Sequence, residues 1–242
     1  MSQSSDASTE RLVKFLSSAG VASRRAAGEL VKTGRVAVNG KTVLEPGLQV
    51  VSGDAVTFDG RPVHPAERLR YFMLNKPRGY VCTSADPHAP LKAIDLLHPD
   101  PPVRLFSAGR LDKESEGMLL FSNDGEYVAR LTHPRHEILK TYLVRVVRDF
   151  TSAELERIRA GIRDDGETLR VISIDPAGKC RYRIVLNEGR KREIRRLTAA
   201  AGASTLELRR VRIGGLELGT LAVGAFRELS PEEVSLTLQP HC

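Results

Sequence analysis

The chain has 242 residues, 41% of them hydrophobic and 28% charged, and a formal net charge of +7. This length allows one large domain or two unequal ones, and the composition is that of an ordinary globular protein. No apolar run reaches membrane-spanning length, and residues 1–6 lack the basic start and apolar core of a secretory signal. We therefore expect a cytoplasmic protein that makes no contact with a membrane.

The cysteines suggest neither disulfide bonds nor a metal site. Cys82, Cys180 and Cys242 are widely spaced, form no CxxC pair and belong to no zinc-like cluster with histidine. No glycine loop of the Walker or dinucleotide-binding type is present. The sequence therefore predicts free thiols, no metal and no cofactor.

Positive charge is concentrated in two segments. Residues 11–41 contain seven Lys or Arg against the single acid Glu29, and residues 181–212 contain nine Arg and one Lys against three Glu. Solvated basic faces are common, but two concentrated segments are more typical of a protein that contacts a phosphate backbone. The charge therefore favours a polyanionic partner.

The chain begins with a polar stretch and two predicted helices. Residues 1–9 are small and polar, and we expect a disordered tail. Apolar residues fall at helical spacing between Leu12 and Ala19, and Gly20 can end that helix. Ser23 can cap a second helix that runs to about Lys32.

A hairpin follows these helices. Residues 36–38 and 41–44 are predicted strands joined by a type I′ turn at Asn39-Gly40, and a further strand lies near residues 55–58. The module resembles the RNA-binding S4 domain, first known from a small-subunit ribosomal protein. The matching stretches are Arg11-Leu12-x-x-Phe15-Leu16, Ser23-Arg24-Arg25 and Gly34-Arg35-Val36-x-Val38-Asn39-Gly40.

The resemblance implies that Arg24, Arg25, Lys32 and Arg35 face structured RNA. The alternative is a small helix–hairpin domain whose charges are only solvated. On this basis residues 10–58 form the S4-like domain, and residues 59–68, with two prolines and no apolar periodicity, form a linker.

Residues 69–242 are predicted to form one larger domain. Strands are expected at 71–74, 80–82, 118–122, 141–147 and 181–186. A capping box at Thr151-x-x-Glu154 opens a helix to about residue 162, and a second helix is expected at 192–201. Strands outnumber helices and do not alternate regularly with them, which predicts an α+β fold with a mixed, mostly antiparallel sheet.

One loop of this domain stands out. The stretch Gly109-Arg110-Leu111-Asp112-Lys113-Glu114-Ser115-Glu116-Gly117-Met118-Leu119-Leu120-Phe121 runs from a charged loop into an apolar strand, and Asn123-Asp124-Gly125 is predicted as a closing turn. Loops fixed by a strand often carry catalytic groups, although a solvated, salt-bridged Asp is the ordinary alternative. The stretch resembles the signature of pseudouridine synthases, Gly-Arg-Leu-Asp-x-x-Thr/Ser-x-Gly-Leu-Leu-Leu, and the resemblance places the catalytic aspartate at Asp112.

Three further segments match the same family. Leu74-Asn75-Lys76-Pro77-x-Gly79 resembles its Asn-Lys-Pro segment, which implies that Lys76 supports the site. Lys140-Thr141-Tyr142 implies that Tyr142 stacks on the target base and assists proton handling at C5, where a core tyrosine is the default. Gly189 to Arg196 resembles the Gly-Arg-x-x-Gln-Ile/Val-Arg-Arg segment, with Arg192 and Glu193 departing from the usual His and Gln.

The last match implies that Arg195 pairs with Asp112, which would keep the carboxylate ionised. Arg190 and Arg192 are expected to contact RNA. Arg110 has two interpretations, a phosphate contact or a salt bridge within the loop. Glu114 and Glu116 are interpreted as solvated loop charges.

Over residues 11–235 the chain thus resembles the bacterial ribosomal RNA pseudouridine synthases of the RsuA/RluB group. The resemblance implies a monomer that binds structured ribosomal RNA, or a ribosomal subunit precursor, and extrudes one uridine without metal or cofactor. The carboxylate would attack the sugar or remove a sugar proton. Gly-Arg-Lys-Arg-Glu-Ile-Arg-Arg slightly favours a large-subunit target. The alternatives are a non-catalytic RNA-binding factor and a hydrolytic nucleosidase.

Overall fold

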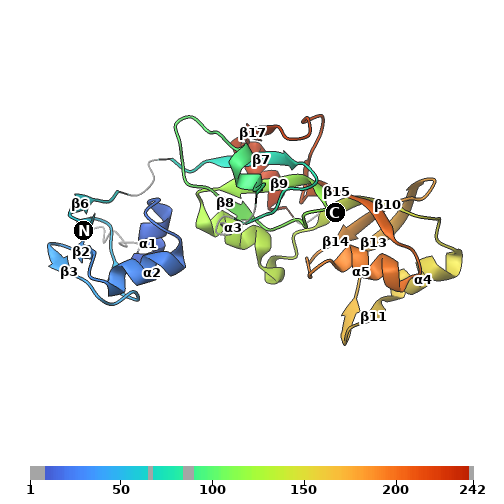
Figure 1. Ribbon diagram of the computed structural model, residues 1–242, viewed down its shortest axis with the longest axis horizontal. Coiled ribbons are helices and arrows are strands. Elements are labelled where there is room, and N and C mark those ends of the chain that lie inside the picture. Colours follow the sequence, from blue (N-terminus) through green and yellow to red (C-terminus); the bar gives the residue numbers. More distant parts are fainter. Residues whose placement is uncertain (1–8, 65–67, 84–89, 240–242) are drawn as a thin grey trace, which may run out of the picture. The chain divides into compact units, whose positions relative to one another are not determined.

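The computed structural model describes residues 9–64, 68–83 and 90–239. The chain divides after Leu69 into two compact units, Met1–Leu69 and Arg70–Cys242 (Figure 1). Apart from Thr9, the predicted tail lies outside the described residues, as do residues 65–67 of the predicted linker.

The first unit contains two helices and short strands around a small apolar core. Its core includes Leu12, Leu16, Ala27, Val31 and Val36, all fully buried. Strands β2, β3, β5 and β6 form one sheet, ordered β3-β2-β5-β6, and β1 pairs with β4. The elements are β1 (Glu10–Arg11), α1 (Leu12–Ser18), α2 (Arg24–Lys32), β2 (Val36–Val38), β3 (Lys41–Thr42), β4 (Gln49–Val50), β5 (Val56–Phe58) and β6 (Arg61–Pro62).

The local signals in this unit act as predicted. The Ser23 hydroxyl accepts a hydrogen bond from the Ala26 amide at 3.3 Å and caps α2. Asn39 and Gly40 both have positive φ, 51° and 76°, as a type I′ turn requires. The sequence placed residues 59–62 in the linker, but they form a turn and strand β6, which pairs with β5. Pro62 is tolerated there because β6 is an edge strand.

The second unit is built on a nine-stranded sheet ordered β13-β14-β10-β15-β9-β7-β17, with β16 beside β15 and β8 beside β9. All strand pairs are antiparallel except β9 with β15, which confirms the predicted α+β fold. The strands are β7 (Tyr71–Lys76), β8 (Phe106–Ala108), β9 (Glu116–Ser122), β10 (Lys140–Val146), β13 (Ser173–Gly178), β14 (Arg181–Leu186), β15 (Thr205–Ile213), β16 (Leu216–Glu217) and β17 (Phe226–Glu228).

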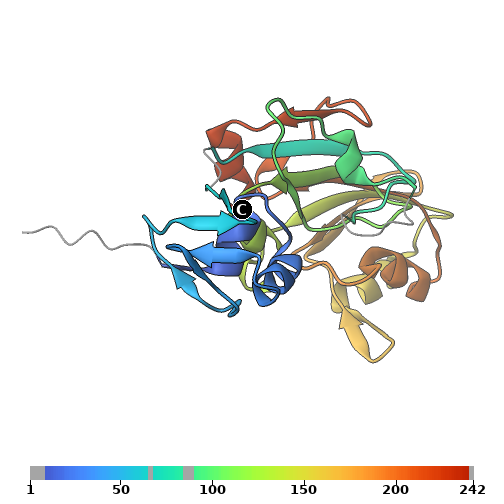
Figure 2. The ribbon, with the colours of Figure 1, turned by 60° about the vertical axis from the view of Figure 1, so that its left-hand side comes forward.

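Helices and a separate hairpin complete this unit. They are α3 (Gly125–Thr132), α4 (Ser152–Ala160), α5 (Glu193–Ala200), α6 (Pro231–Thr237), the short 3-10 turns η1 (Ala93–Leu96) and η2 (Pro134–His136), and the hairpin β11 (Ile162–Asp164) and β12 (Glu167–Leu169). The views of Figures 1 and 2 both show this hairpin projecting from the rest of the unit.

The two halves of the sheet are buried differently. Strands β7 and β9 contribute to separate clusters on their two faces, with Met73 and Leu120 in one and Leu74 and Leu119 in the other. Strands β10, β13, β14 and β15 share one cluster with α4 and α5. On these strands exposed residues alternate with the buried ones, so only one face of this half is covered by the helices.

Three local predictions were wrong. Residues 80–82 form no strand, only an isolated bridge from Val81 to Lys92. Asn123–Gly125 does not close a hairpin, because the Asp124 carboxylate accepts the amides of Glu126 and Tyr127 and starts α3. Helix α4 stops at Ala160, where Gly161 takes a φ of 96°.

Gly117 marks the closest approach in the sheet, where β9 pairs with β15. A Cβ at this position would lie 2.3 Å from the Arg210 carbonyl oxygen, and its φ is +102°. We expect Gly117→Ala to lower the free energy of unfolding by about 2–4 kcal/mol, because backbone strain and overlap add. Chemical denaturation measures the change.

Gly166→Ala is the matched control, since Gly166 has a φ of +77° and nothing within 4 Å of an added Cβ. It should cost only about 1–2 kcal/mol from backbone strain. Equal losses in the two variants would show that the close contact at Gly117 is not what limits that position.

Candidate active site

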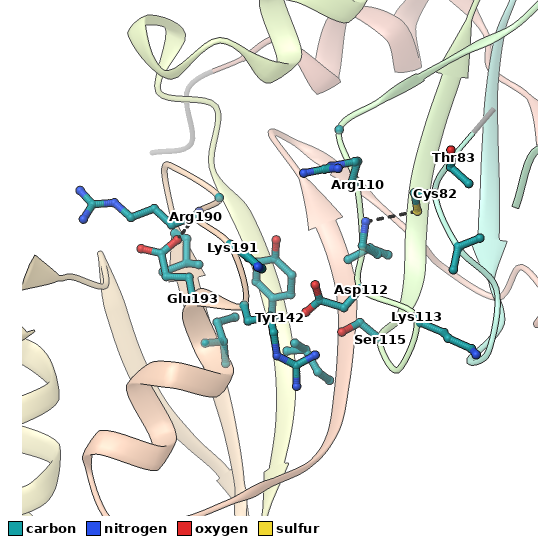
Figure 3. A pocket seen from close by; sticks show the side chains of 18 residues that line it. Cys82, Thr83, Arg110, Asp112, Lys113, Ser115, Tyr142, Arg190, Lys191 and Glu193 are labelled. Atoms are coloured by element: carbon teal, nitrogen blue, oxygen red, sulfur yellow. Dashed lines mark hydrogen bonds between the residues drawn. The ribbon is translucent and has the colours of Figure 1, made fainter. Parts of the chain in front are cut away.

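A pocket of about 590 Å³ opens beside the loop that precedes β9, the loop that contains Asp112. Its walls come from residues 109–113 and Ser115, from Tyr142 on β10, from Leu208 on β15 and from the turn 189–194 before and into α5. Figure 3 shows the Asp112 carboxylate and the Tyr142 ring close to one another within it. The pocket therefore collects side chains that are far apart in the sequence.

Asp112 and Arg195 form the charged pair of the site. The Asp112 Oδ2 lies 4.0 Å from the Arg195 Nε, and the side chains are 30% and 12% exposed. The Arg195 Nη2 also donates to the Glu114 carbonyl at 3.2 Å and the Ser115 hydroxyl at 3.4 Å. Burial and the nearby Arg192 lower the pKa of Arg195, whereas Asp112 and Glu114 raise it.

The Nε of Arg195 is buried and has no hydrogen-bond partner among the described residues. At 4.0 Å it attracts Asp112 without bonding to it, so the carboxylate is held by charge and keeps its lone pairs available.

Lys76 organises the loop from beneath. It ends β7 and is completely buried, and its Nζ donates to the carbonyls of Ser115 at 2.6 Å, Pro77 at 3.0 Å and Asp112 at 3.3 Å. Burial lowers its pKa, which the neighbouring Cys82 and carboxylates partly offset. The sequence predicts that Lys76 supports the site, and an ammonium buried on three carbonyls is in position to hold the loop and is not exposed to contact RNA.

Tyr142 forms the inner wall of the pocket. Its side chain is 7% exposed and belongs to the same core cluster as Leu111, Leu186 and Ile194. Strand alternation on β10 places it on the face covered by α5. Both predicted descriptions of Tyr142 are therefore compatible with its position, since it packs in the core and also lines the pocket.

The turn before α5 forms the opposite wall. Arg192 takes the left-handed conformation, with a φ of 52°, and its Nη1 contacts the Glu114 carboxylate at 3.1 Å. The Glu193 Oε2 accepts the Arg190 amide at 2.9 Å, and burial raises the pKa of Glu193. Arg190 contacts Glu188 at 3.0 Å and the Thr168 carbonyl at 3.2 Å. Both arginines are thus already paired.

Arg110 and Lys191 are different, because both are exposed, line the pocket and have no ionic or hydrogen-bonding partner among the described residues. For Arg110 the loop salt bridge is therefore not formed. Lys191 was not singled out from the sequence, although the basic run around it was the available signal.

Cys82 is a second residue that the sequence did not indicate. It lines the pocket, and its Sγ accepts the Leu111 amide at 3.3 Å, next to Asp112 (Figure 3). A long-range sulfur contact of this kind leaves no periodic or motif signal.

The predicted RNA-contacting residues of the first unit lie on and after α2. Arg24 and Arg25 are exposed in its first turn, where positive charge opposes the helix dipole. Lys32 pairs with Glu29 at 2.9 Å. Arg35 pairs with Asp59 and lies 4.7 Å from the Phe58 ring centroid.

No group of three or more His, Cys, Asp or Glu side chains among the described residues could hold a metal ion. None of the described helices is long and apolar enough to cross a membrane.

Comparison with known families matches both units. Residues 70–200 match the model of the RNA pseudouridylate synthase family, and residues 10–56 match the S4 domain. The chain is 38% identical over 231 residues to ribosomal large subunit pseudouridine synthase B of Bacillus subtilis, covering 93% of this chain and 94% of that protein.

Other relatives act on a different subunit by name. Ribosomal small subunit pseudouridine synthase A of Escherichia coli is 35% identical over 230 residues, covering 93% of this chain and 98% of that protein. A crystal structure described as a pseudouridylate synthase superimposes with a TM-score of 0.69 at 28% identity, covering 94% of this chain and 99% of that one.

Replacing Lys76 tests its position under the loop. We expect Lys76→Met to lower the free energy of unfolding by about 2–4 kcal/mol, because three carbonyls lose their buried donor. Chemical denaturation measures the loss, and Lys179→Met, which removes an exposed ammonium from the β13–β14 turn, should change it by less than about 0.5 kcal/mol. A neutral Lys76→Met would mean that the loop carbonyls do not depend on this ammonium.

Proposed function

The chain belongs to the RNA pseudouridylate synthase family, and we propose that it converts one specific uridine of ribosomal RNA to pseudouridine with Asp112 as the catalytic carboxylate. One observation carries the assignment of the residue. The Asp112 carboxylate lies on the wall of a pocket, close to Tyr142 and 4.0 Å from the Nε of the largely buried Arg195. Relatives named as pseudouridine synthases of the large and the small ribosomal subunit support the substrate class.

The reaction exchanges one bond for another at the ribose C1′. The bond from C1′ to N1 breaks, uracil leaves as a delocalised anion and turns within the pocket, and C5 bonds to C1′. N1 then holds a proton and C5 loses one, so the product is an isomer. A single carboxylate suffices, either as a nucleophile at C1′ or as the base that removes a sugar proton.

The surrounding residues divide the work. Arg195 holds the Asp112 side chain by charge, and Lys76 fixes the carbonyls of the loop that carries it. We assign Tyr142 to stacking on the extruded base and to proton handling at C5. The half-apolar lining of the pocket, with Leu186, Ile194 and Leu208, suits a flat base that must turn without leaving.

Cations at the pocket wall are assigned to the phosphates around the extruded nucleotide. Arg110 and Lys191 are available without rearrangement. Arg192 must exchange the Glu114 carboxylate for a phosphate, and Arg190 must loosen from Glu188. The exposed pairs are weak enough for such exchange, since they contribute about 0–1 kcal/mol each.

The S4 unit is assigned to electrostatic binding of folded RNA. Arg24 and Arg25 stand against the helix dipole of α2, so their position gains nothing for the helix and suits a phosphate contact. The pairs at Lys32 and Arg35 lie on the surface and can open toward RNA.

We propose that the target uridine lies in the large ribosomal subunit. A monomer of this protein modifies it, either in ribosomal RNA or in a subunit precursor. The sequence of residues 189–196, Gly-Arg-Lys-Arg-Glu-Ile-Arg-Arg, supports this choice. Mapping pseudouridines by carbodiimide labelling and primer extension, in RNA from cells with and without the gene, tests it. Loss of a small-subunit site instead would contradict the large-subunit proposal.

Asp112→Asn tests the catalytic role. We expect pseudouridine formation to fall by at least about a thousandfold, because an amide cannot act as nucleophile or base at C1′, while RNA affinity stays within about twofold. Asp165→Asn, an exposed carboxylate of the β11–β12 turn, is the control and should keep full activity. Sizeable residual turnover would remove Asp112 from its role, and free uracil as the product would favour a hydrolytic nucleosidase.

A triple variant, Arg24→Gln, Arg25→Gln and Lys32→Gln, tests the S4 unit. We expect the triple variant to bind ribosomal RNA more weakly. The slope of log Kd against log salt concentration should fall by about 2, because each lost phosphate contact lowers that slope by about 0.7–0.9. Neutralising the exposed Arg130, Arg157 and Arg170 of the second unit is the matched control. Equal slopes for the two variants would contradict the assigned role of α2.

A further inference from the structure

The sheet of the second unit has an open, arginine-rich face that the proposed reaction does not use. Along β10, Tyr142 and Val144 are buried under α5 and α4, and Leu143 and Arg145 alternate to the opposite face. The same alternation on β14 buries Tyr182 and exposes its neighbours Arg181 and Arg183. The face is therefore the reverse side of the strands that form the wall of the active-site pocket.

This face is hollowed. Two adjoining hollows of about 240 Å³ and 200 Å³ share Leu143 and Arg209. We call them together the sheet-face groove, and its principal residues are Leu143, Arg145, Arg181, Arg183, Arg209 and Arg212. The strand register puts Leu143 between Arg183 and Arg209, so two arginines flank one exposed leucine across three strands.

The charge of the groove is only partly compensated. Its lining holds five arginines and three glutamates. Arg145 is bound to Glu207, and Arg212 lies 3.8 Å from Glu217.

No described carboxylate lies at salt-bridge distance from Arg181, Arg183 or Arg209, although the charge of Arg181 helps Arg145 to lower the pKa of Glu207. The third glutamate, Glu116, does not reach them, nor does Asp175, which stands opposite Arg183 in the β13–β14 register. The Nε of Arg209 is buried and has no hydrogen-bond partner among the described residues.

These features fit a phosphate backbone better than a protein partner. Every cation in the groove is an arginine, whose planar guanidinium binds phosphate bidentately. Each hollow is less than half the volume of the active-site pocket, and the two adjoin one another, which suits a backbone followed along its length better than an engulfed base. Unpaired guanidinium groups in a hollow also gain directly from an anion, since no internal pair must first be broken.

We propose that the sheet-face groove binds the backbone of a second RNA segment, separate from the segment that enters the active site. The two sites lie on opposite faces of the same strands, so one short RNA strand does not occupy both. The inference rests on the proposed RNA substrate and adds to it that the protein holds folded RNA on two sides. A long, folded RNA then binds more tightly than the minimal substrate.

The test compares two RNAs and two variants of the full chain. The RNAs are a complete large-subunit ribosomal RNA transcript and its shortest fragment that the wild-type protein still converts. The groove variant is Arg181→Gln with Arg183→Gln, and both side chains are exposed, which limits any effect on folding. The control variant is Arg130→Gln with Arg157→Gln, which removes the same charge from exposed positions on α3 and α4.

We expect the groove variant to bind the complete transcript about tenfold more weakly, with a salt slope of log Kd lower by about 1.4, while fragment binding and turnover stay within twofold. The control variant should change neither RNA selectively. The proposal is overturned if both variants weaken transcript binding equally, if the groove variant weakens neither RNA, or if it weakens the fragment as much as the transcript.

Failure of the proposed function is read separately. If no fragment is converted by the wild type, the reaction assignment fails, and the affinity and salt slope for the complete transcript still decide the groove. A groove variant that converts the fragment at the wild-type rate is folded, so its transcript affinity can be interpreted directly.

Discussion

The site depends on one buried ammonium. Lys76 is fully enclosed, and its three hydrogen bonds all go to carbonyls of its own turn and of the loop that carries Asp112. Carbonyls that face inward in a tight loop need such a donor, because leaving them bare is costly. With the backbone fixed in this way, the Asp112 side chain needs little direct hydrogen bonding. It can be steered by the charge of Arg195 and still keep its oxygens available to a substrate.

The two halves of the sheet are covered differently, and this difference separates the pocket from the open face. Where β7 and β9 are buried on both sides, they make a rigid support for the loop. Where β10, β14 and β15 are covered on one side only, the covered face shapes the pocket and the other face is left with arginines. A period of two along each strand is enough to produce this division, since neighbouring residues point to opposite sides. The covered face carries residues that match the family's segments. The proposal for the open face rests on the alternation of side chains along the strands.

Much of the fold could be predicted from local signals. The Ser23 cap, the Asn39-Gly40 turn and the Thr151–Glu154 capping box all act as their residue types require. Helix α3 was not predicted, because Asp124 is a common turn residue. In the structure its carboxylate instead accepts hydrogen bonds from the amides of Glu126 and Tyr127 and caps the helix. It could foresee neither the burial of Lys76 nor the Cys82–Leu111 contact, since both arise only when distant segments pack together. The family resemblance indicated Asp112, Tyr142 and Arg195, which the structure brings together, and their roles stay proposals.

The parallel pairing of β9 with β15 has a mechanical consequence. It joins the two halves of the sheet through a short register, Glu116 with Arg209 and Gly117 with Arg210, reinforced by the buried Arg210 Nε on the Met118 carbonyl at 2.8 Å. Asp112 belongs to one half, whereas Tyr142 and Arg195 belong to the other. The active site therefore straddles a seam, and any breathing of that seam changes the distance between the carboxylate and its counter-ion. The distance between Asp112 and Arg195 thus depends on how closely the two strands meet, which the small size of Gly117 permits.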